Sequence, residues 1–168
     1  GRYDVQGEQV NTGFEFMSGG KITSNLSVLG GFTLINSKFK DPLLKGANGK
    51  VVNGVPKLNS NLLFDYVVPN TEKLAFTTNF HYTGKRYVDE LNTKSVDSYF
   101  TMDLGARYTT KAWLGKETTI RFNVNNVFDK KYWVGMFPGS LDGEVKNSGT
   151  NLFRSYDRTF MLSAQVKF

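Results

Sequence analysis

The sequence lacks cysteine entirely, and this absence removes several kinds of site at once. Without thiols the chain has no disulfides, no thiolate metal ligands and no cysteine nucleophile. It also holds a single histidine, His81. A metal or haem site at His81 would need ligands from distant parts of the chain, and no nucleophile-elbow pattern accompanies it. We therefore predict no catalytic residue, no metal site and no intrinsic cofactor, and we do not expect an enzyme.

Long apolar runs are absent as well. No stretch approaches the roughly 20 consecutive apolar residues that a membrane-spanning helix needs. The first ten residues, "GRYDVQGEQV", have neither the charged nor the apolar region of a signal peptide. The net charge is +6, but the lysines and arginines are scattered among Asp and Glu, so we expect no nucleic-acid partner. The mean hydropathy of −0.35 is compatible with barrel strands, because these alternate apolar and polar residues.

What the sequence does contain is strict alternation. In the closing stretch "FMLSAQVKF", the apolar residues Phe160, Leu162, Ala164, Val166 and Phe168 take every second position. A period of two predicts a β-strand with one face in apolar surroundings. Apolar side chains fall on even-numbered positions in seven such segments: 10–16, 22–34, 58–68, 74–82, 100–108, 120–124 and 160–168.

The connections between these segments alternate in length. Three are short, namely "SGGK" (18–21), "PNTEK" (69–73) and "KAWLGKE" (111–117), and three are long and polar, namely 37–56, 85–97 and 130–152. Asn48-Gly49 predicts a type I′ hairpin turn within the first long connection, between "LLK" and "KVV". Trp113 and Trp133 fall at opposite strand ends, as expected for the aromatic girdles of a membrane barrel.

Two architectures accommodate this alternation, a soluble β-sandwich and a transmembrane β-barrel. The patterned runs reach about 9 to 13 residues, whereas strands of soluble proteins usually have about 5 or 6. We therefore predict an all-β fold, an antiparallel meander of about seven long strands that forms part of a transmembrane β-barrel. Single-chain bacterial barrels have even strand numbers, so residues 1–168 are expected to be one part of a larger barrel.

Several segments carry a family likeness. They are "NGVPKLNSNLLFDY" (53–66), "YTGKRYVDELN" (82–92), "YFTMDLGARYT" (99–109), "FNVNNVFDKKYW" (122–133) and "RTFMLSAQVKF" (158–168). Together they resemble the C-terminal part of the barrel of TonB-dependent outer-membrane receptors, particularly the ferric-siderophore branch. The segment 122–133 is the most specific of them. Phe168 resembles the family's terminal assembly signal, although Val166 stands where an aromatic residue is common.

The resemblance implies a fold, a location and partners. It implies a 22-stranded barrel in the Gram-negative outer membrane, of which residues 1–168 would be the last strands, with the N-terminal plug domain and the earlier strands absent. It implies a receptor and transporter for a ferric siderophore, driven by TonB through the missing plug region. Outer-membrane lipid and lipopolysaccharide would surround the wall. The alternative is a structural or adhesive outer-membrane β-barrel protein.

Ligand capture at the mouth of a barrel must use residues from the long outer connections. Aromatic or apolar side chains could line a pocket for an iron chelate, and cationic side chains could attract an anionic chelate. The aromatic and apolar candidates are Tyr87, Trp133, Met136, Phe137, Phe153 and Tyr156, and the cationic candidates are Arg86 and Arg154. The other interpretation is that the aromatics form a girdle and the cations bind lipopolysaccharide phosphates. For Asn123, Asn125 and Asn126 we favour a structural role in the turn over ligand binding.

Overall fold

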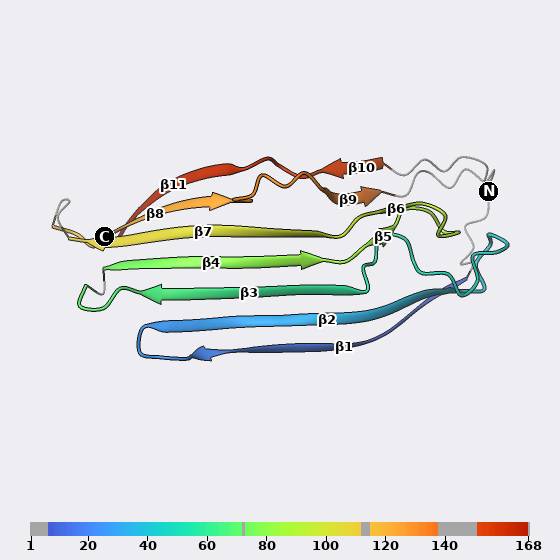
Figure 1. Ribbon diagram of the computed structural model, residues 1–168, viewed down its shortest axis with the longest axis horizontal. Helices are drawn as coiled ribbons and strands as arrows, with labels where there is room; N and C mark the ends of the chain where they lie inside the picture. The colour runs from blue at the N-terminus through green and yellow to red at the C-terminus, as the bar shows by residue number, and fades with distance from the viewer. Residues whose placement is uncertain (1–6, 72, 112–114, 138–150, 168) are drawn as a thin grey trace.

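The computed structural model describes residues 7–71, 73–111, 115–137 and 151–167. Seven strands form one antiparallel sheet in the order β1-β2-β3-β4-β7-β8-β11, drawn in Figure 1 as a single layer. The strands of this sheet are β1 (Glu8–Lys21), β2 (Leu26–Lys40), β3 (Leu58–Val67), β4 (Leu74–Thr83), β7 (Tyr99–Thr110), β8 (Thr118–Asn125) and β11 (Thr159–Val166). Two small hairpins lie apart from it: β5 (Arg86–Tyr87) with β6 (Ser95–Val96), and β9 (Trp133–Phe137) with β10 (Asn151–Arg154). The predicted all-β meander of seven long strands is confirmed.

The register places all even-numbered residues of the sheet on one face. In each of the six pairings an even-numbered residue lies opposite an even-numbered one, as with Phe16 and Phe32 or Phe80 and Met102. Directly opposed residues of an antiparallel pair point to the same side. The alternation seen along each strand therefore adds up to one continuous apolar face, with aromatic contacts running across it.

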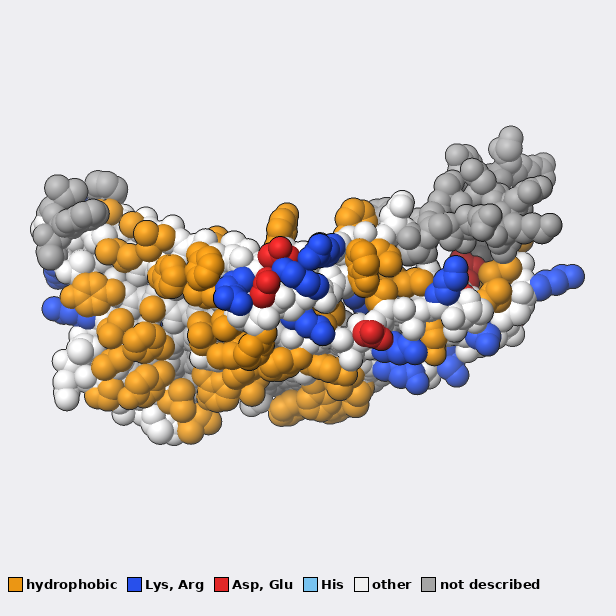
Figure 2. Space-filling model, turned by 45° about the horizontal axis from the view of Figure 1, so that its top comes forward, with side chains coloured by type: hydrophobic (Ala, Val, Ile, Leu, Met, Phe, Trp, Pro, Cys, Tyr) orange, Lys and Arg blue, Asp and Glu red, His pale blue; other side chains and the backbone are white. Residues whose placement is uncertain are grey.

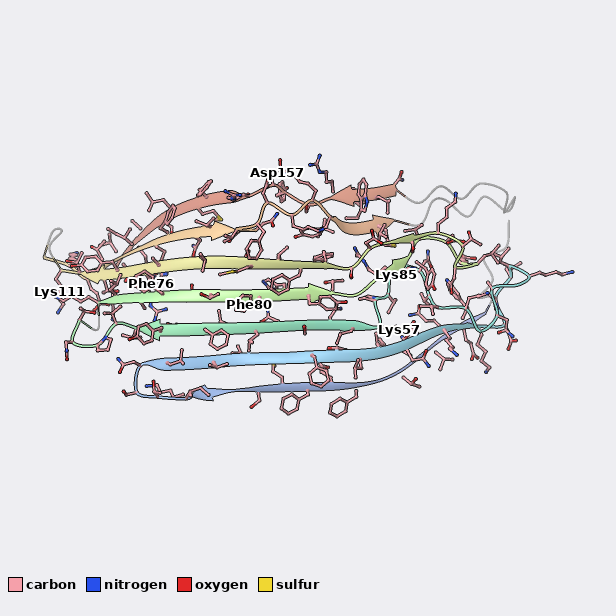
Figure 3. The ribbon with its side chains drawn as sticks, viewed as in Figure 1. Lys57, Phe76, Phe80, Lys85, Lys111 and Asp157 are labelled. Atoms are coloured by element: carbon pink, nitrogen blue, oxygen red, sulfur yellow. The ribbon has the colours of Figure 1, made fainter. Side chains whose placement is uncertain are left out.

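This apolar face has no second layer packed on it. Among the described residues, the only buried apolar side chains are those of Ala47, Val52, Ala75 and Val96. The exposed large apolar residues of the seven strands are even-numbered except for Met17, Leu29 and Met161. Figure 2 shows apolar side chains gathered over one half of the molecule's length, with most of the charged side chains toward the other. A β-sandwich would bury such a face in a core of its own, so the sandwich interpretation fails.

Within the described residues, no helix is long and apolar enough to cross a membrane.

The short connections gather at one end of the sheet, together with the C-terminal end of the chain (Figure 1). The first of them is displaced from its predicted position. "SGGK" lies inside β1, and the turn falls at residues 22–25 instead. Thr23 explains the shift, because its hydroxyl accepts hydrogen bonds from the backbone N–H groups of Asn25 and Leu26. Trp113 and Phe168 lie outside the described residues.

The predicted hairpin at Asn48-Gly49 is wrong. Residues 50–52 pair with the end of β2 and not with residues 43–45: Lys38 bridges Val51, and the Val52 N–H donates to Ser37 O. The Asn48 side chain instead accepts a hydrogen bond from the Asp41 N–H. A turn does form at Asn48-Gly49, since the Lys50 N–H donates to Ala47 O at 3.0 Å. The open row of backbone groups on the long β2, however, outcompetes residues 43–45 as the pairing partner.

Candidate functional site

The long connections gather at the end of the sheet opposite the short turns (Figure 1). The segment 85–97 contacts its neighbours on both sides. Toward residues 51–54, the Asn92 side chain accepts from the Val51 N–H at 2.8 Å and donates to Val51 O at 2.8 Å. The Gly54 N–H also donates to Tyr87 O at 2.8 Å. An amide that pairs with both polar groups of one residue reproduces a rung of a β-ladder, so the two loops are held side by side.

On its other side, the segment 85–97 is joined to β9 by Arg86. The guanidinium donates from Nη1 to Val134 O at 3.2 Å and from Nη2 to Trp133 O. Its central carbon lies 5.8 Å from the centre of the Tyr99 ring. Arg86 is only 6% exposed, and its Nε finds no hydrogen-bond partner among the described residues. This arginine thus lies inside the loop assembly, where its two terminal nitrogens bind backbone carbonyls.

A stacked aromatic pair continues this contact toward β10. The Tyr99 and Tyr132 rings stack with centroids 3.9 Å apart. Burial, followed by the charges of Tyr99 and Asp103, raises the pKa of the Tyr132 phenol. Tyr132 and Ser155 exchange hydrogen bonds, since the Ser155 N–H donates to Tyr132 O and the Tyr132 N–H donates to the Ser155 hydroxyl. The chain entering β9 and the chain leaving β10 are therefore locked together.

The predicted ligand-binding residues occupy different settings in this assembly. Trp133, Phe153 and Tyr156 are exposed, the last to 91%. The Tyr87 ring lies 5.5 Å from the Lys85 ammonium, and Arg154 lies 3.5 Å from Asp157. Met136 packs over Gly54, where an added Cβ would lie 3.3 Å from the Met136 sulfur. The Phe137 backbone belongs to β9, but its side chain lies outside the described part of the structure.

The segment "FNVNNVFDKKYW" is organised around Asn126. This residue is buried, has a φ of 53°, and accepts a hydrogen bond at its side-chain oxygen from the Lys130 N–H. Its amide nitrogen donates to Lys130 O and Tyr156 O, and its own N–H donates to Asp103 Oδ1. The structural interpretation is confirmed for Asn126, which ties both ends of the connection between β8 and β11 to Asp103 of β7.

Charged residues close the same region on the solvent side. Lys131 bridges Asp129 and Asp157, and the Arg158 N–H donates to Asp129 Oδ1 at 2.8 Å. The Arg158 N–H first, and Lys131 second, lower the pKa of Asp129. The Asp157 and Asp129 carboxylates raise the pKa of Lys131. These exposed pairs keep each other charged at neutral pH but add little stability.

The odd-numbered face of the sheet is polar and carries a hollow of about 1000 Å³. His81 and Asp103 both line it, with His81 Nε2 lying 3.3 Å from Asp103 Oδ2. The amide groups of Asn61 and Asn79 contact the two ring nitrogens of His81 at 2.8 and 2.6 Å. Among the described residues, no group of three or more His, Asp or Glu is arranged to hold a metal ion. This network presents hydrogen-bond donors and acceptors along the hollow.

One long-strand sheet with an apolar face, a polar face and structured loops at one end defines the wall of a membrane β-barrel. The comparisons with known proteins agree. Residues 1–127 match the family model described as TonB dependent receptor-like, beta-barrel, and the chain belongs to this family. The chain is therefore part of an outer-membrane β-barrel of the Gram-negative type.

Relatives and solved structures cover almost the whole chain. The chain is 29% identical to the ferrichrome receptor FcuA of Yersinia enterocolitica over 99% of its own length and 21% of the receptor's. It is 32% identical to the ferrioxamine receptor of the same species, over 77% of its own length and 18% of that protein's. The crystal structure of BauA, the ferric preacinetobactin receptor from Acinetobacter baumannii, superposes with a TM-score of 0.82 at 30% identity, covering 97% of this chain and 23% of that one. The chain thus spans about a fifth of the length of these relatives.

Proposed function

We propose that this chain forms part of the wall and outer mouth of a TonB-dependent transporter for a ferric siderophore. The observation that carries the proposal is the likeness, over nearly the whole chain, to receptors whose names specify ferrichrome and ferric preacinetobactin. The loop assembly supports it, because three connections far apart in sequence are brought together at one end of the sheet. The relatives are transport receptors and not enzymes.

We further propose that residues 1–168 are the C-terminal strands of the barrel, with β11 as the closing strand. The resemblance of 158–168 to the family's final strand supports this placement. A plug domain elsewhere in the parent protein would fill the lumen and contact TonB. The polar odd-numbered face would then look into the lumen, and lipid and lipopolysaccharide would surround the even-numbered face.

In this proposal the ligand meets the exposed aromatic and apolar side chains of the outer loops. Trp133, Phe153 and Tyr156 are the best placed, because they are exposed on the connections that gather at the mouth. Tyr87, Met136, Phe137 and Arg154 complete the proposed wall. Arg86 is buried, so its contribution would come through the backbone of β9.

Deletion of the gene for the full-length parent protein tests the proposal. Uptake of ⁵⁵Fe-ferrichrome and ⁵⁵Fe-ferrioxamine B, and of a wider panel of labelled ferric siderophores, would be measured in iron-starved cells with and without the gene. We expect uptake of at least one chelate to fall to background and to return with a plasmid copy. Unchanged uptake and binding of every chelate would instead favour the structural or adhesive alternative.

A further inference from the structure

The outer connections share one buried charged side chain. Arg86 belongs to β5, yet its two terminal nitrogens bind carbonyls of Trp133 and Val134, which lie 47 and 48 residues further along the chain. A guanidinium is always charged and offers five N–H donors in a planar fork, a geometry suited to two adjacent carbonyl oxygens. These two hydrogen bonds join the segment 85–97 to β9.

The position of Arg86 also explains how a buried cation is tolerated. The Tyr99 ring lies 5.8 Å from the guanidinium carbon, and Tyr99 itself stacks on Tyr132. An aromatic face and two carbonyl dipoles partly replace the water that the charge has lost. Replacement of Arg86 by a shorter neutral residue would remove these donors from the two carbonyls and the cation from Tyr99.

The elements on each side of Arg86 are themselves tied to further loops. The segment 85–97 is bound to residues 51–54 through Asn92 and Tyr87, and β9 is paired with β10. Met136 of β9 packs over Gly54, so the first and third loops also meet directly. Arg86 therefore links two elements, β5 and β9, each of which contacts a further loop.

We propose that Arg86 is a positioning residue: its guanidinium holds the β9–β10 hairpin against the segment 85–97, so that three outer loops form one preset wall and do not move as independent flaps. The coupling of the loops is inferred from the contacts alone. The effect of this coupling on ligand affinity rests on the proposed function. Trp133, whose carbonyl Arg86 binds, is the ligand-facing residue that depends on it most directly.

The first test is amide hydrogen exchange in the purified full-length parent protein. The variants are Arg86→Gln, Arg86→Lys and, as a control for charge loss in the same exposed loop, Lys94→Gln. Hydrogen bonds to a charged donor are stronger than neutral ones, so the loss of both should speed local opening about tenfold or more. We expect that acceleration in residues 133–137 and 151–154 of Arg86→Gln and none in β3, β4 or β7.

Arg86→Lys keeps the charge but loses the planar fork, so we expect an intermediate acceleration, and Lys94→Gln should match the wild type. Wild-type exchange in β9 and β10 of Arg86→Gln would overturn the proposal. If that variant does not accumulate in the membrane, wild-type exchange in Arg86→Lys overturns it in the same way.

The second test uses the labelled chelate that the wild type transports. A positioning role predicts a higher half-saturating concentration in Arg86→Gln with an unchanged maximal rate per receptor, partly rescued in Arg86→Lys. An unchanged half-saturating concentration would overturn the link to ligand binding. Absence of uptake by the wild type would refute the proposed function and leave the exchange result standing.

Discussion

Among the described residues, the non-glycine residues with positive φ lie in or beside the connections between strands: Asn70 lies in a short turn, and the other four belong to the outer connections. Asp41, Asn92, Asn126 and Asp129 all have positive φ, and each lies in or beside a long connection. Asn and Asp tolerate the left-handed region better than other non-glycine residues because their short side chains can bind the local backbone. Asn126 was therefore interpretable from the sequence as a turn residue, whereas Asn123 and Asn125, for which a role in the turn was also expected, lie in β8. Their sequence positions did not reveal which one would be buried.

Replacement of Asn126 by alanine is expected to destabilise the parent receptor by about 2–4 kcal/mol. The Lys130 N–H and C=O lose their hydrogen bonds to the side chain, and an alanine is strained at a φ of 53°. The free energy of unfolding in lipid vesicles measures the loss. Asn126→Gly separates the two causes, since glycine accepts the backbone conformation, and it should lose about 1 kcal/mol less. A loss below about 0.5 kcal/mol in Asn126→Ala would contradict the assigned role.

The hydrogen bonds to the Asp89 carboxylate predict that its loop loses stability at low pH. Burial alone would raise the pKa of its carboxyl, but hydrogen bonds from the Thr93 and Lys94 N–H groups and the Thr93 hydroxyl lower it below the ordinary 3.8. The stabilisation is then complete above pH 3.8 and is lost as the pH falls through the lowered pKa. Exchange of the Thr93 and Lys94 amides, measured between pH 2.5 and 6, checks this.

Asp89→Asn supplies the matched variant for that titration. Its side chain cannot ionise, so the acid-dependent increase in opening at Thr93 and Lys94 should disappear once intrinsic exchange chemistry is corrected for. A titration midpoint above 3.8 in the wild type would show that burial outweighs the hydrogen bonds.

At the scale of elements, the long strands were predictable and the small hairpins were not. Each long strand repeats a period of two over many residues, and errors at single positions average out. The strands β5, β6, β9 and β10 have only two to five residues each, too few for a period to show. Their contacts also depend on distant groups, as with Arg86 and Val134. The turn predicted at "SGGK" was wrong for the same reason, a contact that the period does not show: a hydrogen bond to the Thr23 side chain stabilises the turn four residues later.

A substitution at Gly105 tests how closely β4, β7 and β8 pack on the polar face. A Cβ at this position would collide with the Thr77 hydroxyl and lie 2.7 Å from Asn123 Oδ1. Gly105→Ala should therefore destabilise the barrel by about 1–3 kcal/mol, measured as urea unfolding in vesicles. Gly20→Ala is the control, since nothing lies within 4 Å of its added Cβ. Thr77→Ala added to Gly105→Ala should recover part of the loss, and strict additivity of the two changes would contradict the collision.

At the scale of the whole molecule, the register of the sheet explains why the two-residue alternation was enough to predict the fold. Because every pairing joins even-numbered to even-numbered residues, a pattern read along single strands also holds across the sheet. A slip of one residue in any pair would have moved one strand's apolar set to the other face. The outer site could be anticipated only as a set of loops, because its geometry depends on contacts between segments dozens of residues apart.

The assignment of the two faces can be tested with spin labels on single-cysteine variants of the parent protein in lipid bilayers. This chain contributes no native cysteine to interfere. Leu104→Cys and Leu162→Cys place labels on the even-numbered face, where both leucines are exposed. Thr77→Cys and Ser163→Cys place them on the odd-numbered face, the first in β4 beside the β7 strand of Leu104 and the second in β11 next to Leu162. Labels in hydrocarbon should collide with dissolved oxygen more than with a polar nickel chelate, because oxygen partitions into lipid. We expect that preference at 104 and 162 and its reverse at 77 and 163. The same accessibility at all four positions, or the opposite order, would show that the apolar face touches protein and not lipid, and the barrel orientation proposed for this chain would be wrong.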